Sequence, residues 1–154
     1  MAQTQPIAFW PPLIVGAIVI SCTILIHGLG VMMVVRYVRR EKDRGHAGKG
    51  FWGDFVIVAT AIQIALVAHL LETGLWAVVF EWCGEFHDFA AAYYHSAVNY
   101  STLGYGDVVM SPSWRLMGPL EAADGMLMFG VSTAMVFALI QGLIQARFID
   151  LRDT

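Results

Sequence analysis

Three long stretches of the chain are too apolar for a soluble protein of this size. They are Leu13–Val35, Phe55–Phe80 and Pro119–Ala146. An α-helix rises about 1.5 Å per residue, so roughly 20 apolar residues cross the hydrocarbon core of a bilayer. Hydrophobic residues make up 58% of the chain, charged residues make up 14%, and the mean hydropathy is +0.64. We therefore predict an all-α membrane protein with three transmembrane helices and with its termini on opposite sides of the membrane.

Basic residues gather in one loop of the chain. Six of the nine Lys and Arg residues lie in residues 36–50: Arg36, Arg39, Arg40, Lys42, Arg44 and Lys49. Loops rich in Lys and Arg stay on the cytoplasmic side. Residues 81–115 contain four acidic residues and one basic residue, so we place them outside. We expect a multi-pass protein of the cell membrane, such as a bacterial inner membrane, with its N-terminus outside and its C-terminus in the cytoplasm.

The stretch Ser101–Asp107 joins the second and third apolar segments and is too rich in glycine for a membrane helix. A dehydrated monovalent cation needs several oxygen ligands, and backbone carbonyls aimed at one axis supply them densely. Alternating carbonyl directions take some residues to positive φ, which glycine adopts without steric cost. Gly104 and Gly106 flank Tyr105, and the Thr102 hydroxyl adds an oxygen. Because one strand cannot surround an ion, this interpretation needs four copies around an axis.

The segment before this stretch predicts a short helix. Asp88 is a good N-cap for Phe89–Tyr100, a helix of about 18 Å at 1.5 Å per residue. Such a helix is too short to cross the membrane, so we interpret it as re-entrant. Its C-terminal end carries a partial negative charge that favours a cation nearby.

Thr102–Asp107 resembles the T-V-G-Y-G-D selectivity filter of tetrameric potassium channels, with Leu103 in place of the usual Val. The rest of the chain is similar to small two-span bacterial potassium channels, with one additional N-terminal helix. The resemblance implies a passive potassium channel made of four identical subunits, with no enzymatic activity and no cofactor. It implies potassium ions bound at Thr102, Leu103, Gly104 and Tyr105, with Gly106 completing the filter. Membrane lipids are the other expected partners, and the short basic loop lacks the features of a nucleic-acid site.

The resemblance also divides the chain. Residues 1–35 form the outer tail and the extra transmembrane helix, residues 36–50 the basic cytoplasmic loop, and residues 51–150 the pore domain. Within the pore domain the expected parts are an outer helix at 53–80, a turret at 81–88, a pore helix at 88–100, a filter at 102–106 and an inner helix at 117–147.

Two pore-helix residues are expected to support the filter. In the resembled family, aromatic residues of the pore helix brace the filter and hydrogen-bond the aspartate that follows it. Tyr94 stands where a Trp is frequent, and it can offer its hydroxyl to Asp107. Val98 stands where some bacterial members have a filter-bonding Glu, so inactivation that depends on such a carboxylate is not expected.

The third apolar segment carries a stripe of residues spaced four apart: Gly125, Phe129, Thr133, Phe137 and Gln141. Such spacing keeps residues near one face of a helix. The stripe is typical of a wetted pore lining, although a helix-packing seam has the same pattern. The resemblance places Gly125 at the family's gating hinge, and Phe137 could close the pore by dewetting.

Ionisable side chains within the apolar segments are the least expected feature of the sequence. The candidates for pH sensing are His69, Glu72, Glu121 and Asp124. Charged groups at membrane depth are rarely left facing lipid, so a paired structural role is the alternative.

Specific partners can be suggested for some of these groups. We expect Glu121 and Asp124 to pair with Asn99 or His95, or with Glu72 by sharing a proton. His27 is placed near the opposite membrane face from the other histidines, so a shared metal site is not expected.

Several alternatives remain open. The chain could be a non-conducting or regulatory subunit with a channel-like fold, or a less selective cation channel. Cys83 could form an intersubunit disulfide or remain a free thiol. No helix carries regularly spaced arginines, which argues against voltage sensing. Eight residues follow Ala146, so we expect no cytoplasmic sensing domain.

Overall fold

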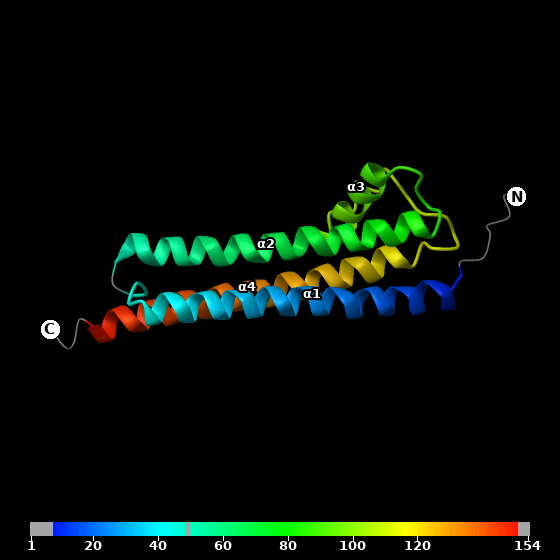
Figure 1. Cartoon of the computed structure of the whole chain (residues 1–154). Helices are drawn as coiled ribbons and strands as arrows, with labels where there is room; N and C mark the ends of the chain where they lie inside the picture. Colours follow the sequence, from blue (N-terminus) through cyan, green and yellow to red (C-terminus); the bar gives the residue numbers. More distant parts are fainter. Residues whose placement is uncertain (1–7, 49, 151–154) are drawn as a thin grey trace, which may run out of the picture. The chain divides into compact units, whose positions relative to one another are not determined.

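The computed structural model describes residues 8–48 and 50–150, and these form four helices and no strand (Figure 1). The helices are α1 (Trp10–Asp43), α2 (Phe51–Trp82), α3 (Phe89–Tyr100) and α4 (Met117–Asp150). Helices α1, α2 and α4 are long and apolar enough to cross a membrane. The predicted all-α class with three candidate spans is therefore confirmed.

The first helix runs further than the sequence predicted. α1 continues through the basic segment to Asp43, so the predicted loop at 36–50 is shortened to its last residues. Arg, Lys and Glu are good helix formers, and the end of an apolar run marks the membrane boundary rather than the helix end. The helix stops at Gly45, which has a φ of 72°. Residues 1–7 of the predicted outer tail and Lys49 of the predicted loop lie outside the described residues.

The same stop motif ends both α1 and α2. Gly45 N–H donates to Lys42 O and His46 N–H to Glu41 O, each over 2.9 Å. After α2, Gly84 N–H donates to Glu81 O over 2.9 Å and Glu85 N–H to Phe80 O over 3.1 Å. These paired bonds satisfy carbonyls that the helix itself leaves unbonded. The first two residues of the predicted turret, Glu81 and Trp82, therefore belong to α2. α4 is also longer than predicted and runs to Asp150 rather than to residue 147.

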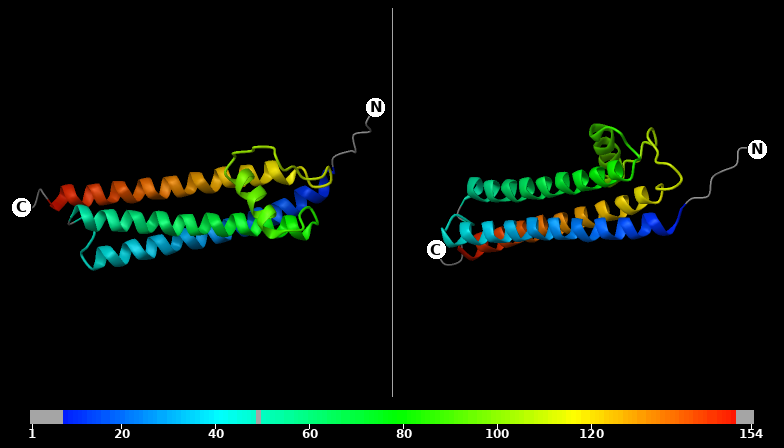
Figure 2. Two further views of the ribbon diagram at one scale, coloured as in Figure 1. Left: turned by 90° about the horizontal axis from the view of Figure 1, so that it is seen from above. Right: turned by 45° about the vertical axis from the view of Figure 1, so that its right-hand side comes forward.

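The described residues divide into two compact units. The first consists of residues 8–26 with Leu70–Met128, and the second of His27–His69 with residues 129–150. The first unit thus contains the beginning of α1, the end of α2, all of α3 and the beginning of α4. Within it, α3 lies beside the last turns of α2 (Figures 1 and 2). Its fully buried apolar side chains include Trp76, Phe80 and Met117.

The second unit contains the remaining parts of the three long helices. An ion pair joins Arg147 of α4 to Asp54 of α2, and Asp54 also accepts a 2.7 Å hydrogen bond from the Gly48 N–H. Gly30 of α1 packs so closely on α2 that an added Cβ would lie 3.3 Å from the Ala68 Cβ. Small residues at such contacts are typical of helices packed in membranes.

Candidate functional site

The candidate filter, residues 102–106, follows directly after α3. The position of the candidate filter therefore depends on the two ends of α3. Asp88 has extended dihedrals (φ −132°, ψ 126°), and its carboxylate accepts a 3.0 Å hydrogen bond from the Ala91 N–H. This N-cap satisfies a donor that the first turn cannot pair internally. The helix ends at Tyr100, so it coincides with the predicted short helix.

The backbone alternates in conformation directly after α3. Thr102, Gly104 and Gly106 have φ angles of 61°, 58° and 73°, whereas Leu103 and Tyr105 are not among the positive-φ residues. An added Cβ would meet no atom within 4 Å at either glycine, so glycine is favoured there by its backbone angles rather than by lack of space. Thr102 is β-branched and pays a steric cost at this φ, which is typical of functional sites. Alternate residues therefore carry the exceptional conformation, as the sequence predicted.

The start of the filter is anchored to the last turn of α3. The N–H groups of Leu103 and Gly104 donate to the Val98 carbonyl over 2.9 and 3.1 Å, and the Thr102 N–H donates to Asn99 O over 2.8 Å. The Val98 side chain is buried, with 7% of its surface exposed. The backbone carbonyl of Val98 thus anchors the candidate filter. This kind of anchoring needs no carboxylate side chain at position 98.

The filter itself is exposed in a single chain. Leu103 is 55% exposed and Tyr105 is 67% exposed, although both side chains are apolar or amphipathic.

A hydrogen bond braces the far end of the filter. The Tyr94 hydroxyl donates to Asp107 Oδ2 over 2.7 Å, which is the contact expected from the sequence. This bond, helped by the backbone N–H groups of Asp107 and Val108, lowers the pKa of Asp107. Beyond it, the N–H and hydroxyl of Ser111 both donate to the Glu85 carboxylate over 2.6 Å. The acidic turret is therefore tied to the segment that follows the filter.

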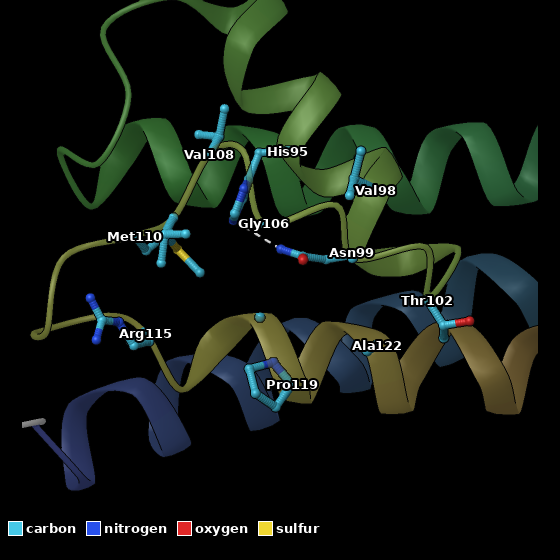
Figure 3. A pocket seen from close by; sticks show the side chains of 13 residues that line it. His95, Val98, Asn99, Thr102, Gly106, Val108, Met110, Arg115, Pro119 and Ala122 are labelled. Carbon is cyan, nitrogen blue, oxygen red and sulfur yellow. Dashed lines mark hydrogen bonds between the residues drawn. The ribbon is translucent and has the colours of Figure 1, made fainter.

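A cavity of about 350 Å³ lies between the filter segment and the start of α4 (Figure 3). Thr102, Gly104 and Gly106 line it on the filter side, and Pro119 and Ala122 on the α4 side. His95 and Asn99 of α3 also reach it, with Asn99 Nδ2 lying 2.9 Å from His95 Nε2.

The predicted stripe on α4 is not uniform. Gly125 is buried in the first unit, where an added Cβ would lie 2.0 Å from the Tyr100 carbonyl oxygen. In the second unit the Phe129 ring lies 4.3 Å from the His69 ring, and its side chain is 41% exposed. Thr133, Phe137 and Gln141 are exposed as well, so four of the five stripe residues are exposed in one chain.

The predicted pairing of the acidic residues with α3 holds for Glu121, whereas Asp124 contacts residues of α1 and α2 that were not predicted. Asp124 accepts hydrogen bonds from the Trp76 indole N–H over 2.9 Å and lies 2.9 Å from the Thr23 hydroxyl. Glu121 lies within hydrogen-bond distance of Ser96. Sequence spacing relates residues within one helix, whereas these contacts join four helices. For Glu121 the expected pairing with α3 is met, because Asn99 as well as Ser96 hydrogen-bonds its carboxyl group.

Glu72 accepts a hydrogen bond from the Tyr100 hydroxyl, at the end of α3. Glu72, Glu121 and Asp124 are each at most 1% exposed. The site therefore includes three buried carboxyl groups in the same unit as the filter.

The placement of His27 at the opposite membrane face from His69 was also wrong. In the second unit their ring centroids are 5.1 Å apart, and both Nε2 atoms lie near the Ser132 hydroxyl, at 3.2 and 3.0 Å. α1 is longer than predicted and its register along α2 was not fixed by the apolar pattern. All three side chains are buried.

Sequence reasoning did not find the hydroxyl-bearing partners of these groups, namely Thr23, Ser96, Tyr100 and Ser132. One signal was present for two of them. Ser96 and Tyr100 are spaced four apart on α3 and so share one helix face.

Residues 68–142 match the family model described as ion channel. The matched residues include α3, the filter segment and most of α4. The match supports an ion channel assignment and points to a channel protein rather than an enzyme. Together with the three long apolar helices, it indicates a multi-pass membrane protein. Comparisons with curated proteins and with solved structures found no match.

Proposed function

We propose that four copies of this chain form a potassium-selective channel. Potassium ions pass between the backbone carbonyls of Thr102, Leu103, Gly104 and Tyr105, with the Thr102 hydroxyl at the inner end. The observation that carries the proposal is the alternation of positive φ at Thr102, Gly104 and Gly106. This alternation lets successive carbonyls turn toward one axis, where they replace the hydration shell of an ion.

Exposure and anchoring support the same function. Leu103 and Tyr105 leave most of their side-chain surface uncovered in one chain, and a fourfold assembly supplies neighbours for them. The C-terminal end of α3 points its partial negative charge toward the start of the filter, which favours a cation there. In this arrangement the N-terminus and the turret lie outside the cell membrane, and the basic end of α1 lies in the cytoplasm.

Potassium selectivity is tested in liposomes with unequal potassium and sodium on the two sides. The expected reversal potential lies near the potassium equilibrium value. Equal permeability to sodium would instead indicate a less selective cation channel, for which Leu103 at the usual Val position is the first residue to examine.

Gly104→Ala is the matched variant for the same assay. Its Cβ meets no atom in a single chain, but the φ of 58° disfavours alanine, so we expect loss of potassium flux with the tetramer retained. Wild-type protein that forms tetramers without any flux would contradict conduction and would favour a regulatory subunit.

A further inference from the structure

Glu121 is a buried carboxyl group at the junction of three helices. It lies on α4 with 0% of its surface exposed. Its Oε1 atom is within hydrogen-bond distance of the Ser96 hydroxyl on α3. The same hydroxyl lies 2.8 Å from the carbonyl oxygen of Thr73 on α2. Ser96 therefore stands between an oxygen of α2 and an oxygen of α4.

The protons available for these two contacts can be counted. A serine hydroxyl has one proton to donate, and a backbone carbonyl oxygen can only accept. If Ser96 donates to Thr73, the contact with Glu121 needs a proton from the carboxyl group. An ionised Glu121 could not supply one, because a carboxylate is an acceptor only. Both contacts are satisfied together only when Glu121 is protonated.

The second carboxyl oxygen agrees with this count. Glu121 Oε2 is buried and makes no hydrogen bond of good geometry among the described residues, although the Asn99 side chain lies close to the carboxyl group. Leaving an ionised carboxylate oxygen buried and unpaired is far more costly than leaving a neutral carbonyl oxygen there.

The titratable groups around Glu121 come from three helices and are mostly acidic. Asp124 lies one turn away on α4. Glu72 of α2 accepts a hydrogen bond from the Tyr100 hydroxyl, and this hydroxyl interacts electrostatically with Glu121. On α3 the titratable neighbour is His95, whose ring contacts the Asn99 side chain. On α1 the nearby group is the uncharged Thr23, whose hydroxyl contacts Asp124. The nearby carboxyl groups are thus of like charge when ionised.

We propose that Glu121 is a proton-binding site whose proton links α4 to α3 and α3 to α2. In the protonated state the carboxyl O–H donates to Ser96, and Ser96 donates to the Thr73 carbonyl. When the proton passes to water or hydroxide, the Ser96 hydroxyl turns to donate to the carboxylate, and its bond to Thr73 is lost. The site takes a proton, and the Ser96–Thr73 bond between α3 and α2 is present only while that proton is bound.

The link bears on the filter because Val98, two residues after Ser96, accepts hydrogen bonds from the filter N–H groups. Loss of the Ser96–Thr73 bond at alkaline pH then loosens the helix end that anchors the filter. This consequence for conduction rests on the proposed function, whereas the proton site itself does not.

Infrared spectroscopy of the purified protein tests the site without conduction. At neutral pH we expect a C=O stretching band of a protonated carboxylic acid that is lost in Glu121→Gln. Gln keeps a donor for Ser96, so this variant mimics the neutral acid. Glu85→Gln is the matched control, because Glu85 accepts two bonds from Ser111 and needs no proton. An unchanged acid band in Glu121→Gln, at neutral and at acidic pH, would overturn the proposal.

A second variant keeps the test valid if Glu121→Gln does not fold. Ser96→Ala retains the carboxyl group and removes its partner, so the acid band is expected to shift in frequency. A band that stays at the wild-type frequency would contradict the link between Glu121 and Ser96.

Potassium flux over a pH series then tests the coupling. We expect wild-type flux to change severalfold between neutral and alkaline pH and the flux of Glu121→Gln to be independent of pH over this range. The same pH response in both proteins would refute the coupling. Absence of flux in both, with the infrared band present, would refute the proposed function and leave the proton site intact.

Discussion

Gly125 is where α4 comes closest to the end of α3. A Cβ at this position would lie 2.0 Å from the Tyr100 carbonyl oxygen and 2.9 Å from its carbonyl carbon. Both are backbone atoms, so neither can move aside as the tip of a flexible side chain does. The structure gives Gly125 a packing role in addition to the hinge role that the family resemblance implies.

Replacing Gly125 with Ala is expected to destabilise the protein by roughly 1–3 kcal/mol or more, as overpacking generally does. Thermal unfolding of the purified protein, followed by circular dichroism, measures this change. Gly28→Ala on α1 is the control, since a Cβ added there would meet no atom within 4 Å. The control should be neutral or more stable by up to about 1 kcal/mol, because alanine is the better helix former. Equal stability of Gly125→Ala and wild type would contradict the close contact.

Cys83 provides a test that depends on pH. Partial burial, and secondarily the charge of Glu85, raises the pKa of the Cys83 thiol. Because the thiolate is the nucleophile, a raised pKa leaves less of it at neutral pH. We expect the rate of alkylation at Cys83 in the folded protein to be below that of the unfolded chain at neutral pH, and to keep rising above the ordinary thiol pKa.

The alkylation rate of a Cys22→Ser variant, in which Cys83 is the remaining cysteine, measures this difference. The direction of the pKa shift of Cys83 also determines how this group affects stability as pH changes. The folded state holds the thiol proton more tightly, so this group favours folding less as pH rises through the window above the usual pKa. A rate equal to that of the unfolded chain would argue against the burial of the thiol.

Individual residues differed in how far the sequence predicted them. The conformations of Gly104 and Gly106 could be predicted, because they depend on local backbone angles. The Tyr94–Asp107 contact was predicted from the family resemblance. Thr23 could not be identified, because a single hydroxyl in a long apolar helix has no periodic signal, and for Ser96 the signal was only its spacing from Tyr100. The partner of a buried hydroxyl depends on how neighbouring helices are aligned along one another, and the apolar pattern does not determine this alignment.

α3 is stabilised at its start by one side chain and by burial of its inner face. The buried residues of this helix are Ala92, His95, Ser96, Val98 and Tyr100. A helix of twelve residues is marginal by itself, so its cap and its packing have to hold it.

Removing the cap in Asp88→Ala is expected to cost about 1 kcal/mol and to loosen the first turn of α3. Hydrogen exchange of the Ala91 amide, which donates to Asp88, reports on this turn directly. Asp88→Ser is the control, because serine is an equally good N-cap. If Ala and Ser gave the same exchange rate, the carboxylate bond would not be the stabilising feature.

The sequence predicted the helices well and their ends less well. α3 has the predicted bounds because both a cap residue and a glycine-rich segment mark its ends. α1 was predicted to stop at Val35, but its polar continuation has strong helix formers as far as the stop at Gly45. Apolar periodicity reports contact with lipid or core, so it could not show where a helix continues into water.

In the first unit, α1 is bound to α4 by polar contacts as well as by packing. Thr23 is 0% exposed, and its hydroxyl lies 3.0 and 2.9 Å from the two oxygens of Asp124. Gly16 of α1 also packs against Leu120, whose Cδ1 would lie 2.6 Å from an added Cβ. The additional helix is therefore part of the unit that holds the filter.

Thr23→Val keeps the shape of the side chain and removes its hydroxyl. We expect a loss of about 1–3 kcal/mol, because a buried carboxyl group is left without one of its partners. The thermal midpoint of the purified protein is the measurement. Ser21→Ala on the same helix is the control, since Ser21 is exposed and its hydroxyl bonds Ala17 O of its own helix. Similar midpoints for both variants would show that the contact with Asp124 does not stabilise the unit.

The Thr23–Asp124 contact has a consequence for biosynthesis. The ribosome makes α4 after α1, α2 and α3, and this helix carries Glu121 and Asp124 into the bilayer. Both carboxyl groups find their partners on helices that have already been made: Thr23 on α1, Trp76 on α2 and Ser96 on α3. Because these partners are synthesised first, the two carboxyl groups need not be left facing lipid once α4 is in the bilayer.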